Sequence, residues 1–154
     1  MKRFLSMALV SVLLVVAFLP INTYASTSTQ ADENIIYFED GSYITIELTC
    51  AETRASGTKT GSKTYRFNNS NGVEQWRAVL RGTFSYTGSS ATCTAASCDV
   101  TISNSSFYVV SKDVSKSGNA ALCELVMGKK LLGITVSKDT INMQITCDAN
   151  GNLS

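Results

Sequence analysis

The stretch YITIELTC, residues 43–50, shows how this chain folds. Its apolar and polar side chains alternate strictly: one set is Ile44, Ile46, Leu48 and Cys50, and the other is Thr45, Glu47 and Thr49. Successive side chains of an extended strand point to opposite faces. The pattern therefore predicts a strand with one buried face and one solvated face.

Short apolar runs separated by turn residues flank this stretch. They predict further strands at residues 35–38, 63–68, 73–87, 91–102, 107–116, 120–127 and 134–147. Residues 51–62 are polar and are expected to form a loop. No segment keeps a helical period through three turns. Regular short strands predict one all-β domain over residues 35–154, an antiparallel β-sandwich or alternatively a small β-barrel.

The pair Asn71-Gly72 is a strong signal for a β-hairpin. A two-residue loop at this pair would place Phe67 opposite Trp76. It would also place Arg66 opposite Arg77, which is unfavourable because like charges directly across a sheet repel.

A four-residue loop, residues 69–72, would avoid that repulsion and would place Tyr65 opposite Trp76. Both loop lengths put Tyr65, Phe67 and Trp76 on one face. We expect Trp76 to be buried against Tyr65 or Phe67, so these aromatic residues form either part of the core or a platform for a ligand.

Residues 1–25 have the three parts of a secretory signal peptide. Lys2 and Arg3 precede an apolar run, and the small residues Thr23 and Ala25 end it. Cleavage is expected between Ala25 and Ser26, followed by a flexible arm at residues 26–34. The mature protein would then be secreted, either free outside the cell or associated with its surface, with no stable membrane span.

The composition excludes several classes of protein. The chain has no His, which removes the commonest general base and the commonest metal ligand. Its 13 basic and 12 acidic residues give a net charge of +1, so its charge does not indicate a nucleic-acid partner. The segment GTKTGSKT, residues 57–64, has too short a spacing between its glycines for a phosphate-binding loop. We expect no nucleotide, cofactor or metal.

Neither the cysteines nor the carboxylates form a recognisable site. The five cysteines lack the close pairs of a zinc ribbon. If residues 91–102 are extended, Cys93 and Cys98 lie about 16 Å apart and cannot bridge. Twelve pairings of the five cysteines remain open. No spacing singles out a catalytic pair among the carboxylates, and Glu39-Asp40 is expected in a turn, so we expect no enzymatic activity.

Several motifs in the second half of the chain resemble a family of small secreted proteins of Gram-positive gut bacteria of the Clostridia type. These motifs are NSNG (69–72), Trp76, GTFSYTGSSATC (82–93), SKSGNA (115–120), LLGI (131–134), Thr146-Cys147 and NGNLS (150–154). The family has no assigned function, so the resemblance implies an exported β-rich domain and no catalytic residues. Cys93 and Cys147 fall within the family's pattern. The resemblance therefore favours Cys93–Cys147 if any disulfide forms.

The expected function is non-enzymatic binding of an extracellular partner such as a glycan, an envelope component or a protein. A groove or an exposed aromatic patch would support this hypothesis. One alternative is a secreted antagonist of competing bacteria, which predicts an exposed apolar strand or hairpin. Another is a small hydrolase, which predicts two carboxylates with different pKa values in one concave site. The basic pair Lys129-Lys130 is expected to lie in a solvated turn.

Overall fold

The computed structural model of the chain describes residues 34–51 and 57–154, and within these ranges it contains eight strands and no helix. The strands are β1 (Asn34–Tyr37), β2 (Tyr43–Ala51), β3 (Thr58–Asn68), β4 (Glu74–Tyr86), β5 (Ala91–Ile102), β6 (Phe107–Ser117), β7 (Ala120–Leu131) and β8 (Ile134–Thr146). The predicted signal peptide and its cleavage site at Ala25 and Ser26 lie outside the described residues. Strand β1 begins at Asn34, the last residue of the predicted arm.

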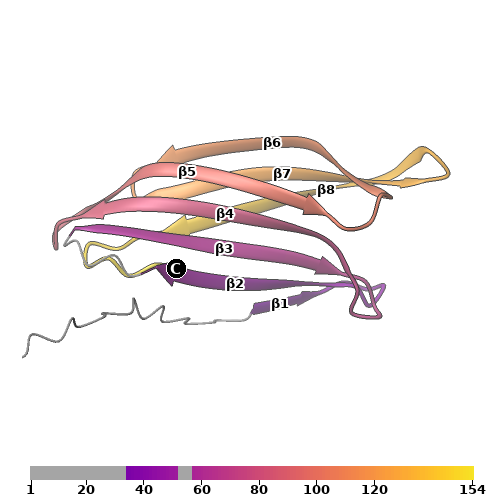
Figure 1. The fold of residues 1–154 in the computed structure, drawn as a ribbon, viewed down its shortest axis with the longest axis horizontal. Coiled ribbons are helices and arrows are strands. Elements are labelled where there is room, and N and C mark those ends of the chain that lie inside the picture. Colours follow the sequence, from indigo (N-terminus) through magenta and orange to yellow (C-terminus); the bar gives the residue numbers. More distant parts are fainter. Residues whose placement is uncertain (1–33, 52–56) are drawn as a thin grey trace, which may run out of the picture.

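The strands form two antiparallel sheets that face each other as a sandwich (Figure 1). One sheet contains β1 to β5 and the other contains β6 to β8, both in chain order. The chain passes from one sheet to the other once, between β5 and β6. The sheets do not close on each other, so the predicted sandwich is confirmed and the alternative barrel is wrong.

The core lies between the two sheets and is built from alternate residues of each strand. Its most deeply buried large side chains are Leu80, Phe84, Leu125, Met127, Met143 and Ile145. Each inward-facing residue is followed by one that faces water, as in β4, where buried Ala78 and Leu80 flank the half-buried Val79. This alternation is what the period of two in the sequence requires.

The β3–β4 hairpin has the register of the two-residue loop, with Phe67 opposite Trp76 and Arg66 opposite Arg77. Its loop differs from both predicted lengths. The Asn69 N–H donates to the Val73 carbonyl (3.0 Å), which leaves three residues in the loop.

Gln75 is an extra residue in β4 that forms a β-bulge, and it restores the register that a two-residue loop would give. Its free carbonyl accepts hydrogen bonds from the N–H groups of Ser103 and Asn104, both at 2.9 Å. The bulge thus fastens the connection between the two sheets.

The repulsion between Arg66 and Arg77 is offset by two carboxylates beside Arg66. Its guanidinium lies 3.3 Å from Glu74 and 3.7 Å from Glu47. Arg66 and Arg77 therefore do lie opposite each other, and the two carboxylates on the same face of the sheet offset their repulsion. The stacking of Phe67 on Trp76 also favours this register.

Of residues 51–62, which were expected to form a loop, most of those that the structure describes lie in strands. Strand β3 begins at Thr58, and Gly61 lies between Cys50 of β2 and Gly82 of β4. A Cβ atom at Gly61 would overlap a methyl carbon of Leu153, so the glycine makes room for that side chain. The segment GTKTGSKT is thus part of a central strand, which a phosphate-binding loop could not be.

Candidate binding groove

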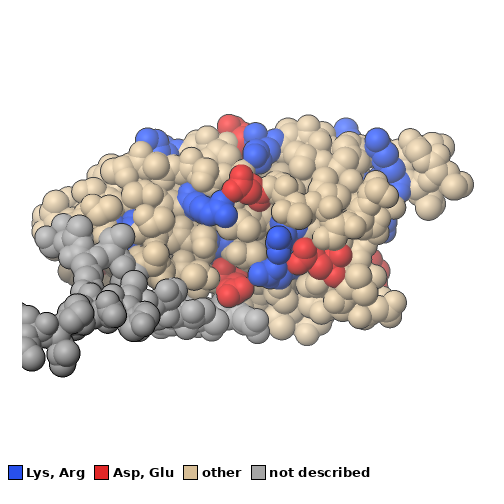
Figure 2. Space-filling model, in the orientation of Figure 1, with Lys and Arg blue, Asp and Glu red and all other residues tan. Residues whose placement is uncertain are grey.

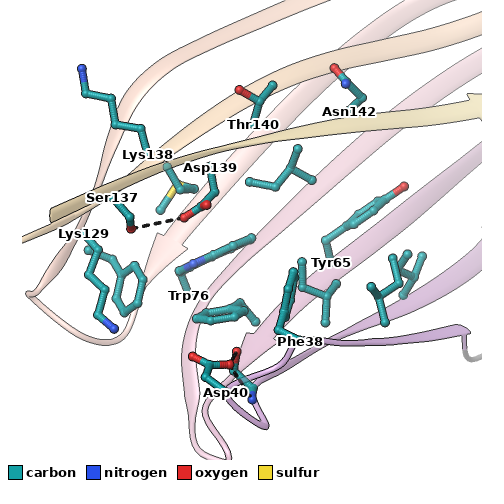
Figure 3. Close-up of a pocket in the computed structure, with 18 of the residues that line it drawn as sticks. Phe38, Asp40, Tyr65, Trp76, Lys129, Ser137, Lys138, Asp139, Thr140 and Asn142 are labelled. Atoms are coloured by element: carbon teal, nitrogen blue, oxygen red, sulfur yellow. Dashed lines mark hydrogen bonds between the residues drawn. The ribbon is translucent and has the colours of Figure 1, made fainter.

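A groove lies along one open side of the sandwich because the two sheets have different widths. The five-stranded sheet extends past the three-stranded sheet, whose edge strand β8 packs over β3 and β4. The inward faces of β1 and β2 therefore lie beside β8 without a strand above them. The resulting groove has a volume of about 930 Å³ and is shown in Figure 3.

The floor of the groove is apolar. It is formed by Ile36, Phe38, Ile44, Ile46, Tyr65, Phe67, Trp76, Phe107, Met127 and Ile141. Three of the rings hold one another: Phe67 stacks on Trp76 with centroids 5.5 Å apart, and Phe38 meets Phe67 edge-on at 6.0 Å. This floor therefore has a fixed shape and favours an apolar occupant.

Charged and polar side chains line one end of the groove (Figure 3). Asp40 accepts a hydrogen bond from the Ser42 N–H at 3.0 Å. Hydrogen bonds from Ser42 lower the pKa of Asp40, and the charge of Lys129 lowers it further. Asp139 lies on the opposite wall and accepts a hydrogen bond from the Ser137 hydroxyl (3.4 Å). This end can thus bind a polar group while the floor binds an apolar one.

The edge of β8 is covered at Thr146, whose backbone pairs with Ser154, and at Gln144, and it is open beyond them. The Lys63 ammonium donates to the Gln144 carbonyl (3.3 Å), and Tyr65 forms a hydrogen bond with the Gln144 backbone N–H. Burial lowers the pKa of Lys63 and raises that of Tyr65. Because every second residue of an antiparallel edge directs its backbone outward, Asn142 and Thr140 direct their N–H and carbonyl groups to the same open side.

Tyr65, Phe67 and Trp76 share one face, as predicted. Trp76 is only 3% exposed and Tyr65 is also buried, so these rings belong to the core and reach the groove only as part of its floor. They do not form an open platform on which a sugar could stack. The sequence left open whether these aromatic residues form part of the core or a platform for a ligand, and the structure supports the core.

The carboxylates that meet in the groove are Glu39, Asp40 and Asp139. Glu39-Asp40 lies in a turn, as the sequence predicts, whereas no sequence pattern indicated Asp139. The signal that could have found Asp139 is its position two residues before Ile141, because this spacing puts both residues on the inward face of β8. The pKa of Asp40 is lowered, whereas a general acid needs a raised pKa. The lowered pKa therefore argues against Asp40 as the general acid of the hydrolase hypothesis.

The five cysteines are free thiols, so the Cys93–Cys147 disulfide favoured by the resemblance is not formed in the structure. Both thiols donate hydrogen bonds to backbone carbonyls instead: Cys93 to Ala95 (3.3 Å) and Cys147 to Asp148 (3.4 Å). Across the sheets, Cys98 is in hydrogen-bonding contact with Cys123.

We expect a thiol-specific alkylating reagent to label only Cys50 in the native protein. Cys50 is half-buried, whereas the other four cysteines are buried. Burial raises the pKa of Cys98 to about 12, and burial also raises the pKa values of Cys93 and Cys147, so few reactive thiolates are present at neutral pH. Mass spectrometry of the labelled peptides provides the measurement. Rapid labelling of Cys93 or Cys147 before unfolding would contradict this expectation.

Comparisons with protein-family models, with curated proteins and with solved structures find no match. In residues 34–51 and 57–154, no helix is long and apolar enough to cross a membrane. The same residues contain no group of three or more His, Cys, Asp or Glu that could hold a metal ion. Conclusions about function therefore depend on the geometry of the groove and of the surface.

Proposed function

We propose that the protein is a secreted, non-enzymatic binding protein whose groove takes an extended peptide segment of another protein. The observation that carries this proposal is the juxtaposition of an apolar floor with an open strand edge. An added strand would lie about 4.8 Å from β8 and would cover the inward face of β2, which no strand of the other sheet covers. Among the expected partners, a protein fits this arrangement better than a glycan, because the aromatic rings are buried.

Both parts of the groove would contribute to binding in this mode. Backbone groups of the peptide would form hydrogen bonds with Thr140 and Asn142. Every second side chain of the peptide would enter the groove, against Ile44 and Ile46. The inward-facing carboxylate of Asp139 would discourage other strands from pairing at this edge, because an unpaired buried charge is costly. Specific partners would therefore place a polar or basic residue at that position.

Among the described residues, the outer surface of the five-stranded sheet offers no comparable site. Figure 2 shows acidic and basic side chains interspersed on this face, without a patch of one sign. Arg81 pairs with Asp99, and Arg66 pairs with Glu47 and Glu74. These solvated ion pairs contribute little stability and leave little unpaired charge for a partner.

The test is selection from a random peptide library displayed on phage, followed by titration of the selected peptides. We expect alternating apolar residues in these peptides. A Thr140→Pro variant should bind them at least about 10-fold more weakly, because proline removes the N–H at an edge position where the strand tolerates it. The matched control, Thr140→Ala, keeps the N–H and should bind like the wild type. Fluorescence of Trp76 in the floor provides the signal.

Equal binding of the Pro and Ala variants would contradict strand addition. Competition by soluble oligosaccharides at the same site would assign the groove to glycans instead. Circular dichroism of each variant checks that the sandwich is intact.

A further inference from the structure

The β7–β8 hairpin extends past the end of the sandwich (Figure 1). Its projecting end carries apolar side chains. Leu131 and Ile134 are paired across the hairpin and are 64% and 71% exposed. Leu131 lies on the same face of β7 as the buried Met127, but the five-stranded sheet does not reach far enough to cover it. Leu132 at the apex is 95% exposed, and Val136 is 54% exposed.

The turn at the apex has a residue that its backbone conformation does not favour. Leu132 has a φ of 51°, and it is the only non-glycine residue with a positive φ among the described residues. Such turns favour Asn, Asp or Gly, because an L side chain in this conformation is strained. A leucine therefore makes the turn less favourable and also exposes an apolar side chain. The two costs together point to a functional role for the apex.

Lysines and a tyrosine surround the base of this apolar tip. The segment 128–138 contains Lys129, Lys130 and Lys138 and no acidic residue. Figure 2 shows basic side chains where the hairpin leaves the sandwich and no charged side chain at its end. The Lys130 ammonium lies 4.5 Å from the centroid of the Tyr108 ring, and the Tyr108 hydroxyl forms a hydrogen bond with Thr135 (2.7 Å). Lys129-Lys130 thus lies within strand β7 and not in the turn expected from the sequence.

We propose that this hairpin tip docks the protein onto the surface of an anionic lipid bilayer. Leu131, Leu132 and Ile134 would enter the boundary between headgroups and acyl chains, and the three lysines would remain among the anionic headgroups. From Leu132 to Lys129 is three residues, or roughly 10 Å of extended strand. Interfacial segments bury their apolar face to a depth of about 5–10 Å. Tyr108 would lie at the level where tyrosines are enriched at membranes.

The charge pattern favours a bilayer over a protein partner. A protein groove for this tip would need its own carboxylates at the positions of three separate lysines, whereas an anionic bilayer presents negative charge all around the tip. The apolar residues of the tip, Leu131, Leu132 and Ile134, lie outside the groove between β1 and β8, whereas Lys129 and Lys138 also line its polar end. The substitutions at Leu131 and Leu132 therefore test membrane docking without altering the groove.

The protein for the test is produced with its own residues 1–25 in a secreting host and is purified from the medium. It is mixed with vesicles of phosphatidylcholine alone and with vesicles of phosphatidylcholine and phosphatidylglycerol in equal parts. We expect sedimentation with the anionic vesicles only, weakened by added salt. The double variant Leu131→Ser/Leu132→Ser should bind about 100-fold more weakly. Val73→Ser makes the same kind of change at the exposed β3–β4 turn and should bind like the wild type.

A second variant, Leu132→Trp, reports the depth of insertion. We expect its fluorescence to be quenched by lipids that carry a nitroxide on the acyl chain, whereas the buried Trp76 of the wild type should be unaffected. Equal binding of the wild type and the double Ser variant, or equal binding to neutral and anionic vesicles, would overturn the proposal. So would failure to bind vesicles together with self-association that the double Ser variant loses, because that result assigns the tip to a protein interface.

Discussion

A Trp76→Ala variant is expected to lose about 3–5 kcal/mol of its free energy of unfolding. Trp76 is 3% exposed, and its ring stacks on Phe67 with an angle of 21° between the planes. Removing the indole leaves a cavity that the paired strands β3 and β4 cannot close without breaking their register. A domain of this size has a total stability of about 5–15 kcal/mol, so the loss is a large part of the whole.

Chemical denaturation followed by circular dichroism measures this effect, since the variant loses the only tryptophan. Tyr37→Ala is the matched control, because Tyr37 is an aromatic residue of the same sheet that is 70% exposed. We expect its effect to be within about 0.5 kcal/mol of zero. If Trp76→Ala kept its stability and lost only peptide binding, Trp76 would be a ligand platform and not part of the core.

The second large effect is expected at Phe84, which folds its ring over Gly82 of the same strand. Phe84 is fully buried, and Phe84→Ala should cost about 3–5 kcal/mol. A Cβ atom at Gly82 would lie 2.6 Å from the Phe84 ring and 3.0 Å from the Cβ of Ala121. Gly82→Ala should therefore also destabilise the wild type, because the buried ring has no room to move.

The two substitutions should not be additive. In the Phe84→Ala background the obstructing ring is gone, so Gly82→Ala should cost less or should stabilise, since alanine loses less backbone entropy in a strand than glycine does. A double-mutant cycle measured by urea denaturation gives the coupling energy directly. Additive effects would show that the ring and the glycine do not exclude each other. Gly88→Ala is unsuitable as a control, because its positive φ of 85° adds a separate strain.

Local sequence patterns predicted most of the strands, because the alternation of inward-facing and outward-facing residues can be read within each strand without knowing its neighbours. The region around Asn71-Gly72 illustrates both the success and its limit. The signal predicted a hairpin and the shared face of Phe67 and Trp76, which the structure confirms. The bulge at Gln75 could not be predicted, because it depends on the hydrogen bonds that the N–H groups of Ser103 and Asn104, between the two sheets, donate to its carbonyl.

The groove could not be predicted from the sequence for a different reason. It exists because one sheet receives five strands and the other three, and that division is decided by where the chain crosses between the sheets. The sequence pattern around residues 103–106 resembles any other turn. Similarly, Gly61 looks like a loop residue until its neighbours on both sides, Cys50 and Gly82, are known.

The pairing of strands only with their neighbours in the chain has a consequence for the kinetics of folding. Each ladder within a sheet can form by closing a short hairpin, which is fast because the loop-closure entropy is small. Docking the sheet of β6–β8 onto the sheet of β1–β5 is the long-range event, and we expect it to limit the rate. The only proline of the chain is Pro20, so no proline isomerisation within residues 34–154 can delay that step. If the chain leaves the cell in N- to C-terminal order, the wide sheet can form first and serve as the template on which the narrow one assembles.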